Sequence, residues 1–402
     1  MLQFSEDPLF QMFAERALTT ITRGGAEYGE CAAVMKRIPP GDNDAWHREW
    51  TALAARVAAW GGVSAARGHR VSAREAFLRA TTYDRISYYP LFGHPVDPRL
   101  TEAFDHETKC FARFAELAEH PVLPVEVPFE GTELPGRLCL PRTGPGTFPT
   151  VIGVNGYDSN IHEMYWSHAV PAVRRGYACL LVDGPGQGQP LVKQGLPMRP
   201  DWETVLSAVV DRAVTLPQVD GSRLVVQGWS FGGYLAPRGT AGEARVAALI
   251  VDPGQWDQLD SFRGVLPLPA ELKDRLPDVD PAELDPHLAV LEENPVLRWK
   301  LVQRGLWVHG LETLGQYVVE MGRFRLSDVV DGISCPTLVA SAEGDAGISG
   351  AERLYDALRC RKERVHFTEA EGASGHCEGW NRSRFDQRVY DWLDEVLGVR
   401  PS

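Results

Sequence analysis

The chain has 402 residues, which is too long for one small core, so its length predicts two or three domains. Its hydrophobic content of 44% and charged content of 24% are those of an ordinary globular protein. A net charge of −13, without a cluster of Lys and Arg, argues against a nucleic-acid partner. No apolar run approaches the roughly 18–20 residues that span a bilayer, so we expect no membrane partner.

The start of the sequence has neither a basic segment nor an apolar segment of the kind found in signal peptides. The seven cysteines are scattered, and none forms a C-x-x-C pair: Cys31, Cys110, Cys139, Cys179, Cys335, Cys360 and Cys377. This usage favours reduced, mostly buried thiols. We therefore expect a cytoplasmic protein.

Residues 1–120 are predicted to be helical. Asp42 or Asp44 can cap a first helix, which Gly61-Gly62 would end. Its apolar residues recur at helical spacing: Trp46, Trp50, Leu53, Val57 and Trp60. Ser72 begins a capping box ahead of a second helix, and a third helix follows Pro98.

This helical region has two interpretations, a bundle that packs on something larger or a lid domain over an active site. Its aromatic residues suit both: Tyr83, Tyr88, Tyr89 and Phe92. We expect most of them to lie in a hydrophobic core.

Residues 121–402 change to strand periodicity. Two extended runs, 122–129 and 134–140, flank a turn and predict a hairpin. Short apolar strands then alternate with helices, at 151–154, 178–182, 224–226, 246–251, 336–341 and 365–367. This alternation predicts the α/β class, with a mostly parallel sheet covered by helices on both faces. Functional sites in such sheets lie at the carboxyl ends of the strands.

Residues 253–330 interrupt this rhythm. Prolines divide the region into short segments, at Pro267, Pro269, Pro277, Pro281, Pro286 and Pro295, and a helical stretch is predicted at 311–321. An insertion after the strand that ends at Val251 would lie near the carboxyl edge of the sheet. We expect it to contribute to the lid, and the alternative is an excursion without a part in binding.

The strand 224–226 leads into Gly-Trp-Ser-Phe-Gly at 228–232, which has the G-x-S-x-G pattern of a nucleophile elbow. The pattern alone is weak in a chain with 39 glycines. A serine also needs a base and a group that orients the base. The strand–turn–helix context predicts Ser230 as the nucleophile.

The partners of Ser230 are expected later in the chain, in the order acid, then histidine. Asp345 follows the strand 336–341, and Glu343 and Asp252 are its rivals. His376 lies in a Gly/Ser loop after the last strand and is the predicted base. His366 lies inside that strand and should be structural.

An oxyanion hole needs two backbone N–H groups. We expect one from Phe231, directly after the nucleophile, and the other from Tyr157, in the loop after the strand 151–154. Asp158, Glu163 and Trp229 are candidates for binding the substrate, with a solvated loop as the alternative for the two acids.

Two further patterns do not indicate a dinucleotide site or a metal site. The run 184–188, Gly-Pro-Gly-Gln-Gly, lacks the G-x-G-x-x-G spacing of a dinucleotide site and predicts a tight loop beside the active site. His162 and His168 have no ligands at metal spacing, so no metal and no cofactor are predicted.

Together these stretches resemble the α/β-hydrolase superfamily, in the branch with an N-terminal helical domain. That branch includes dihydropseudooxynicotine hydrolase, fungal heptaketide pigment hydrolases and FrsA-like esterases. The resemblance rests on residues 71–80, 155–159, 183–188 and 228–234 and on His376. It implies a cofactor-free Ser-Asp-His triad, a pocket between two domains and often a homodimer. It also implies cleavage of an ester or of a carbon–carbon bond beside a ketone.

We therefore expect a hydrolase of a sizeable, partly apolar, polyketide-like small molecule. The alternative is a lyase that eliminates an acyl group, such as acetate in tetronate biosynthesis, with the same triad. A third hypothesis, a non-catalytic binding module, is disfavoured because serine, acid and histidine occur in the expected order.

Overall fold

The computed structural model describes residues 3–141, 146–345 and 348–399. The chain divides into two compact units, one of residues 1–122 with 291–307 and the other of 123–290 with 308–402. Within the described ranges, no helix has both the length and the apolar character that crossing a bilayer requires.

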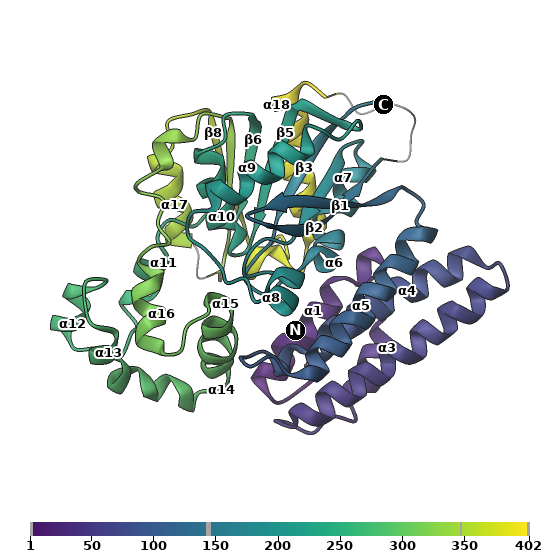
Figure 1. Ribbon diagram of the computed structural model, residues 1–402, viewed down its shortest axis with the longest axis horizontal. Helices are drawn as coiled ribbons and strands as arrows, with labels where there is room; N and C mark the ends of the chain where they lie inside the picture. The colour runs from purple at the N-terminus through teal and green to yellow at the C-terminus, as the bar shows by residue number, and fades with distance from the viewer. Residues whose placement is uncertain (1–2, 142–145, 346–347, 400–402) are drawn as a thin grey trace. The chain divides into compact units, whose positions relative to one another are not determined.

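The N-terminal unit is built on long helices. They are α1 (Pro8–Thr19), α2 (Tyr28–Met35), α3 (Asn43–Ala66), α4 (Arg70–Ser87) and α5 (Pro98–Leu117). The last three run alongside one another, with α4 packed against both α3 and α5 (Figure 1). Of the two candidate caps of α3, Asp42 is the one whose side chain accepts from the backbone, at the N–H of Ala45.

Two helix boundaries differ from the prediction. The helix α3 does not end at Gly61-Gly62, because Gly61 faces α4 at a point of close approach. A Cβ atom on Gly61 would lie 3.2 Å from the Cβ of Ala76, so the glycine serves packing and not termination. Trp60, which shares the helical spacing of the apolar residues of this helix, is 50% exposed. The helix α4 begins at Arg70, so Ser72 lies in its first turn and is not its cap.

The aromatic residues of this unit form its core, as expected: Tyr83, Tyr88, Tyr89 and Phe92 are all buried. Trp299 belongs to the same core although it comes from the segment 291–307. Its ring stacks on that of Phe92 at a centroid distance of 5.6 Å, and its Nε1 donates to the carbonyl of Tyr89 at 2.7 Å. Part of the insertion 253–330 is therefore integral to the helical unit.

The second unit contains an eight-stranded sheet in the order β1-β2-β4-β3-β5-β6-β7-β8. The strands are β1 (Val122–Phe129), β2 (Thr132–Cys139), β3 (Phe148–Val154), β4 (Ala178–Val182), β5 (Val219–Trp229), β6 (Val246–Asp252), β7 (Thr337–Ala342) and β8 (Lys362–Phe367). The pair β2–β4 is antiparallel, and every pair from β4 through β8 is parallel. The predicted mostly parallel α/β sheet is confirmed.

Helices surround this sheet (Figure 1). They are α6 (Ile161–Met164), α7 (Val170–Arg174), α8 (Gly188–Gln194), α9 (Trp202–Ala213), α10 (Gly232–Ala241), α17 (Ile348–Ala357) and α18 (Arg382–Leu397). The helix α10 packs on β5 and β6, and α17 packs on β7. The apolar run 224–226 of β5 is completely buried, as expected for a central strand covered on both faces.

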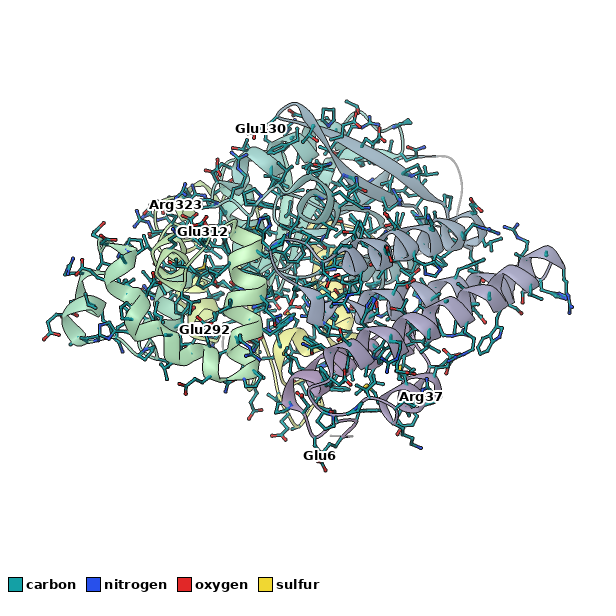
Figure 2. All side chains as sticks on the ribbon, turned by 60° about the horizontal axis from the view of Figure 1, so that its bottom comes forward. Glu6, Arg37, Glu130, Glu292, Glu312 and Arg323 are labelled. Carbon is teal, nitrogen blue, oxygen red and sulfur yellow. The ribbon has the colours of Figure 1, made fainter. Side chains whose placement is uncertain are left out.

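The predicted insertion folds into short helices. They are α11 (Gln258–Arg263), α12 (Ala270–Arg275), α13 (Pro281–Leu288), α14 (Pro295–Leu297), α15 (Trp307–His309) and α16 (Leu314–Met321). A π-helix, Arg298–Leu306, joins α14 to α15. The helix α13 packs against α16. Figure 2 labels six charged side chains, and all six are exposed: Glu6, Arg37, Glu130, Glu292, Glu312 and Arg323.

Candidate active site

Ser230 lies on a sharp turn between β5 and α10. Its φ of +59° is in the left-handed region, which is uncommon for a residue with a side chain. The flanking glycines allow this turn to close. A Cβ atom on Gly228 would lie 2.0 Å from the carbonyl oxygen of Gly232, and one on Gly232 would lie 2.4 Å from that of Val154. The sequence pattern therefore folds as a nucleophile elbow.

Two side chains from distant parts of the chain extend from Ser230 in a line. The Oγ of Ser230 lies 2.8 Å from Nε2 of His376. The Nδ1 of His376 lies 3.0 Å from Oδ2 of Asp345. With Nδ1 protonated, the ring donates to Asp345 and presents Nε2 as an acceptor to the serine hydroxyl. This is the geometry that proton transfer from the hydroxyl requires.

The rival acids face elsewhere. Glu343 accepts from the backbone N–H of Glu369 at 2.8 Å. Asp252 forms an ion pair with Arg382 at 2.5 Å. His366, predicted to be structural, lies 3.0 Å from the hydroxyl of Ser341 through its Nδ1. Of the three carboxylates considered, that of Asp345 contacts His376.

Sequence reasoning missed a buried charge cluster behind His376. It consists of Asp252, Glu378 and Arg382, all of them buried. Arg382 also contacts Glu378, at 3.3 Å. Burial raises the pKa of Glu378 well above its ordinary value, and the nearby charge of Asp252 raises it further. Glu378 and Arg382 are four residues apart but not on one helix, since Glu378 has a φ of +47° and α18 begins at Arg382, so no helical pattern in the sequence marked this pair.

The loop after β3 lies directly against the elbow. A Cβ atom on Gly156 would lie 2.9 Å from the Cβ of Ser230. The ring of Tyr157 packs edge-to-face on that of Phe231, with centroids 4.8 Å apart. The segments that carry the two predicted oxyanion donors are thus adjacent to each other and to the serine. Donation by the N–H groups of Tyr157 and Phe231 stays a prediction.

The loop 183–188 braces the loop that follows β3. The Nε2 of Gln187 donates to the carbonyl oxygens of Asn155, at 2.9 Å, and Gly156, at 3.2 Å. Its Oε1 accepts from the N–H of Gly184 at 3.0 Å. Asp183 accepts from the side chain of Asn155. The predicted tight loop beside the candidate site is confirmed. Its polar residues, Asp183 and Gln187, were the feature of the sequence that could have indicated this supporting role.

The three candidates for substrate binding lie in different settings. Trp229 is half-buried, and its ring lies 6.1 Å from that of His168 and 5.8 Å from the guanidinium of Arg382. Asp158 and Glu163 are half-buried in the loop after β3 and in α6. Binding of a substrate by these three residues stays a prediction.

Aromatic side chains from 308–324 surround the predicted oxyanion segments, and sequence reasoning did not single them out. The ring of His309 lies 5.3 Å from that of Tyr157, and the ring of Phe324 lies 5.6 Å from that of Phe231. The hydroxyl of Tyr157 donates to that of Tyr317 at 3.3 Å. This part of the insertion therefore lies next to the elbow, as expected.

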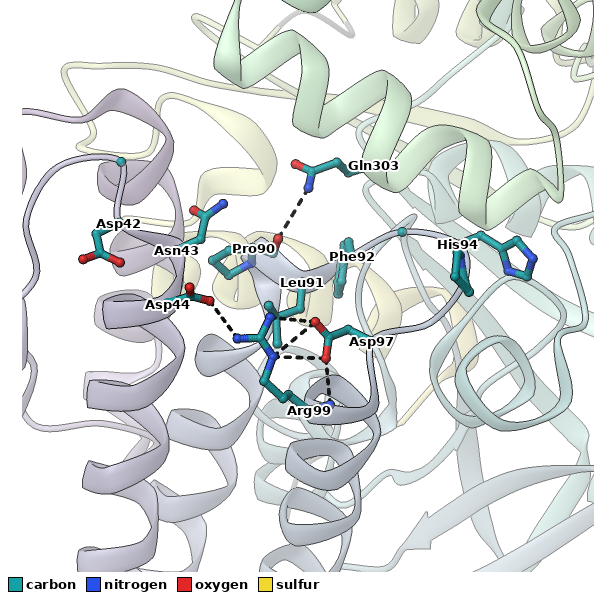
Figure 3. A pocket seen from close by; sticks show the side chains of 13 residues that line it. Asp42, Asn43, Asp44, Pro90, Leu91, Phe92, His94, Asp97, Arg99 and Gln303 are labelled. Atoms are coloured by element: carbon teal, nitrogen blue, oxygen red, sulfur yellow. Dashed lines mark hydrogen bonds and ion pairs between the residues drawn. The ribbon is translucent and has the colours of Figure 1, made fainter.

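A separate cavity of about 720 Å³ lies in the N-terminal unit (Figure 3). Arg99 is one of the residues that line this cavity, and it forms ion pairs with Asp44 and Asp97, each at 2.7 Å. Gln303, from the segment 291–307, donates to the carbonyl of Pro90 at 3.4 Å. The residues that line this cavity include none of the predicted site residues.

A mostly parallel sheet with a serine on a strand–turn–helix elbow defines the class of α/β hydrolases. The chain belongs to this class, because the profile of the alpha/beta hydrolase family matches residues 151–390. The profile of the FrsA-like esterases matches residues 40–252, which include most of the helical region.

Named relatives extend over nearly the whole chain. Hydrolase acrC of Aspergillus aculeatus is 32% identical, with 100% of this chain and 99% of the relative covered. The 20-hydroxy-prefusarin hydrolase FUS2 of Gibberella moniliformis is 35% identical, with 96% of each covered. These relatives and the family show that the protein is an enzyme, a hydrolase.

Solved structures share the fold. The crystal structure of the 2,6-dihydroxy-pseudo-oxynicotine hydrolase matches with a TM-score of 0.76 at 23% identity, over 96% of this chain and 97% of the other. The structure of AbyA5 matches with a TM-score of 0.67 at 15% identity, over 97% and 95%. The expected fold, an α/β hydrolase preceded by a helical region, is confirmed.

Proposed function

We propose that this enzyme is a serine hydrolase that cleaves an ester, or a carbon–carbon bond beside a ketone, in a sizeable and partly apolar secondary metabolite. The observation that carries the proposal is the continuous line from Ser230 through His376 to Asp345, with contacts of 2.8 Å and 3.0 Å. A serine hydroxyl becomes a nucleophile when an oriented imidazole accepts its proton.

In the proposed reaction, Oγ of Ser230 attacks the carbonyl carbon while Nε2 of His376 takes the hydroxyl proton. Asp345 holds the imidazole in the required tautomer and stabilises its positive charge. The backbone N–H groups of Tyr157 and Phe231 bind the oxyanion. Collapse expels an alkoxide, or a carbanion equivalent in the ketone case, which receives the proton from His376. Water then attacks the acyl-enzyme and releases the acid.

The substrate class is supported by two observations. The relative from Gibberella moniliformis, at 35% identity over 96% of both chains, is a hydrolase of 20-hydroxy-prefusarin. The elbow is bordered by aromatic side chains, those of Tyr157, Phe231 and His309. Such surfaces suit a partly apolar small molecule. The lid function of residues 1–120 stays a prediction.

A fluorophosphonate probe tests the nucleophile. We expect covalent labelling at Ser230, identified by peptide mass spectrometry, and loss of labelling when the protein is unfolded first. Absence of label on folded protein would remove serine from the mechanism and favour a binding module.

Product analysis in ¹⁸O-water distinguishes the reaction types. Hydrolysis places the label in the released acid, together with an alcohol or a shortened ketone. An alkene as the second product would favour the acyl-eliminating lyase.

Two further parts of the proposal are a cytoplasmic location and a homodimer. Cell fractionation tests the first, and light scattering tests for twice the chain mass of 44.4 kDa.

A further inference from the structure

Three side chains of metal-ligating type meet between α4 and α5 of the N-terminal unit. Asp84 comes from α4, whereas His106 and Cys110 are four residues apart on α5 and share one face. One ligand atom from each lies within 4.8 Å of the others. The Nδ1 of His106 lies 2.6 Å from Oδ2 of Asp84 and 3.8 Å from Sγ of Cys110. This trio is remote in sequence from the residues of the elbow.

The carboxylate of Asp84 has an unsatisfied oxygen. Its side chain is completely buried, and among the described residues Oδ1 has no hydrogen-bond partner although Oδ2 contacts His106. A buried acceptor without a partner is unfavourable, and native structures contain few of them. The unsatisfied oxygen of Asp84 therefore indicates a ligand that the protein chain itself does not supply.

The surroundings contain a further acidic group. Glu107 follows His106 on α5 and is also buried. A bound cation would offset the negative charges of the Asp84 carboxylate and of the Cys110 thiolate.

We propose that Asp84, His106 and Cys110 bind a divalent transition-metal ion, for which Zn²⁺ is the best match. Zinc takes carboxylate oxygen, imidazole nitrogen and thiolate sulfur in tetrahedral sites, whereas Mg²⁺ and Ca²⁺ avoid thiolates. With bonds of about 2.0–2.3 Å, the ligand atoms of a tetrahedral site lie roughly 3.3–3.8 Å from one another. The Nδ1–Sγ distance of 3.8 Å already matches, whereas Nδ1 of His106 and Oδ2 of Asp84, now 2.6 Å apart, have to separate to admit the ion.

Binding releases protons. The ion replaces the proton shared by His106 and Asp84, and the thiol of Cys110 loses its own proton to solvent. The side chain of His106 is 40% exposed, which gives the ion a route from solvent. Water supplies the fourth ligand. The ion would cross-link α4 to α5 and stabilise the N-terminal unit in its folded state.

Zinc retention in the full-length chain tests this inference. The protein is stripped with a chelator, incubated with ZnCl₂, desalted and analysed for bound zinc, and its thermal unfolding is recorded. We expect one zinc per chain and a raised midpoint. Cys110→Ser and His106→Gln should each lower retention at least tenfold and abolish the shift. Cys31→Ser, at a buried thiol of α2 in the same unit, should keep both.

Circular dichroism of each variant reports whether it is folded, and Co²⁺ gives a second readout. A thiolate–cobalt absorption band should appear in the wild type and in Cys31→Ser. The inference is overturned if wild type retains no more zinc than Cys110→Ser, or if it shows no thiolate–cobalt band.

Discussion

Arg382 donates to the buried carboxylate of Asp252 at 2.5 Å and to the carbonyl of Cys377 at 2.9 Å. Cys377 directly follows His376, and the carbonyl of Asp252 accepts from the N–H of Ser230 at 2.7 Å. One buried ion pair therefore connects the backbone beside the proposed base to that of the proposed nucleophile. Cys377 has a φ of +52°, a strained conformation that needs such support.

Replacing Arg382 with methionine should destabilise the protein strongly. The change leaves Asp252 buried without its partner, which typically costs about 3–5 kcal/mol. Urea denaturation measures the free energy of unfolding. The control is Arg323→Met, because Arg323 is exposed and pairs with Glu320 on the surface. Such a change should stay within about 0.5 kcal/mol. Equal effects of the two substitutions would contradict a special role for the buried pair.

The buried Glu378 should make stability depend on pH. Burial raises the pKa of Glu378 well above 4.5, so the folded protein keeps a proton that the unfolded chain releases. The folded state then binds more protons, and the free energy of unfolding should fall as pH rises above about 4.5. Glu378→Gln cannot ionise, so it should be more stable than wild type at pH 8 and similar at pH 4.

Urea midpoints at these two pH values give the measurement. The matched variant Glu312→Gln, at an exposed carboxyl, should follow the wild type at both. If Glu378→Gln also follows the wild type, the carboxyl is ionised in the folded protein and its pKa is not raised.

Ser230→Ala should abolish turnover of p-nitrophenyl esters. Removal of a triad nucleophile costs on the order of 10⁴-fold or more in kcat. Ser222→Ala, an exposed serine at the start of the same strand, should leave kcat unchanged. Near-normal turnover by Ser230→Ala, at an unaltered melting temperature, would exclude the serine mechanism.

The sequence predicted the sheet and the elbow because both depend on local patterns. Apolar runs bounded by turns mark buried strands, and G-x-S-x-G is a steric requirement that only small residues meet. The proximity of Asp345 and His376 to Ser230 could be predicted for a related reason, and their catalytic roles stay a prediction. Each follows a strand, and the carboxyl ends of parallel strands meet at one edge of the sheet.

Other features depend on tertiary contacts that no local pattern reports. Gly61 looks like a helix stop, yet it is a contact point for Ala76 on the next helix. Trp299 lies in the insertion by sequence, yet it completes the core of the helical unit. The pairing of Asp252 with Arg382 joins residues 130 positions apart. In each case the partner, and not the residue itself, determines the role.

Asp345→Asn should lower kcat by on the order of 10⁴-fold, because an amide cannot hold the imidazole in the tautomer that accepts the serine proton. Glu343→Gln is the matched control, since it removes a carboxylate two residues away that contacts the N–H of Glu369. It should change kcat by less than about threefold. A larger loss in Glu343→Gln than in Asp345→Asn would transfer the proposed role to Glu343.

Gln187→Leu should lower kcat about 10- to 100-fold with little change in KM. The side-chain amide holds the carbonyls of Asn155 and Gly156, which precede the proposed donor Tyr157. Leucine cannot donate, so the loop loses both contacts. A shift of about 1 Å in a positioned group can cost on the order of 10²-fold in rate. Donors aimed at an oxyanion act mainly in the transition state, so kcat should fall and KM should not.

Steady-state kinetics with a p-nitrophenyl ester and a thermal melt separate positioning from folding. The matched control is Gln194→Leu, at the end of α8, where the exposed amide donates to the carbonyl of Glu133 at 3.4 Å. That variant should keep kcat and KM. If Gln187→Leu raises KM and leaves kcat unchanged, the brace contributes to ground-state binding, and Tyr157 then loses its assignment as an oxyanion donor.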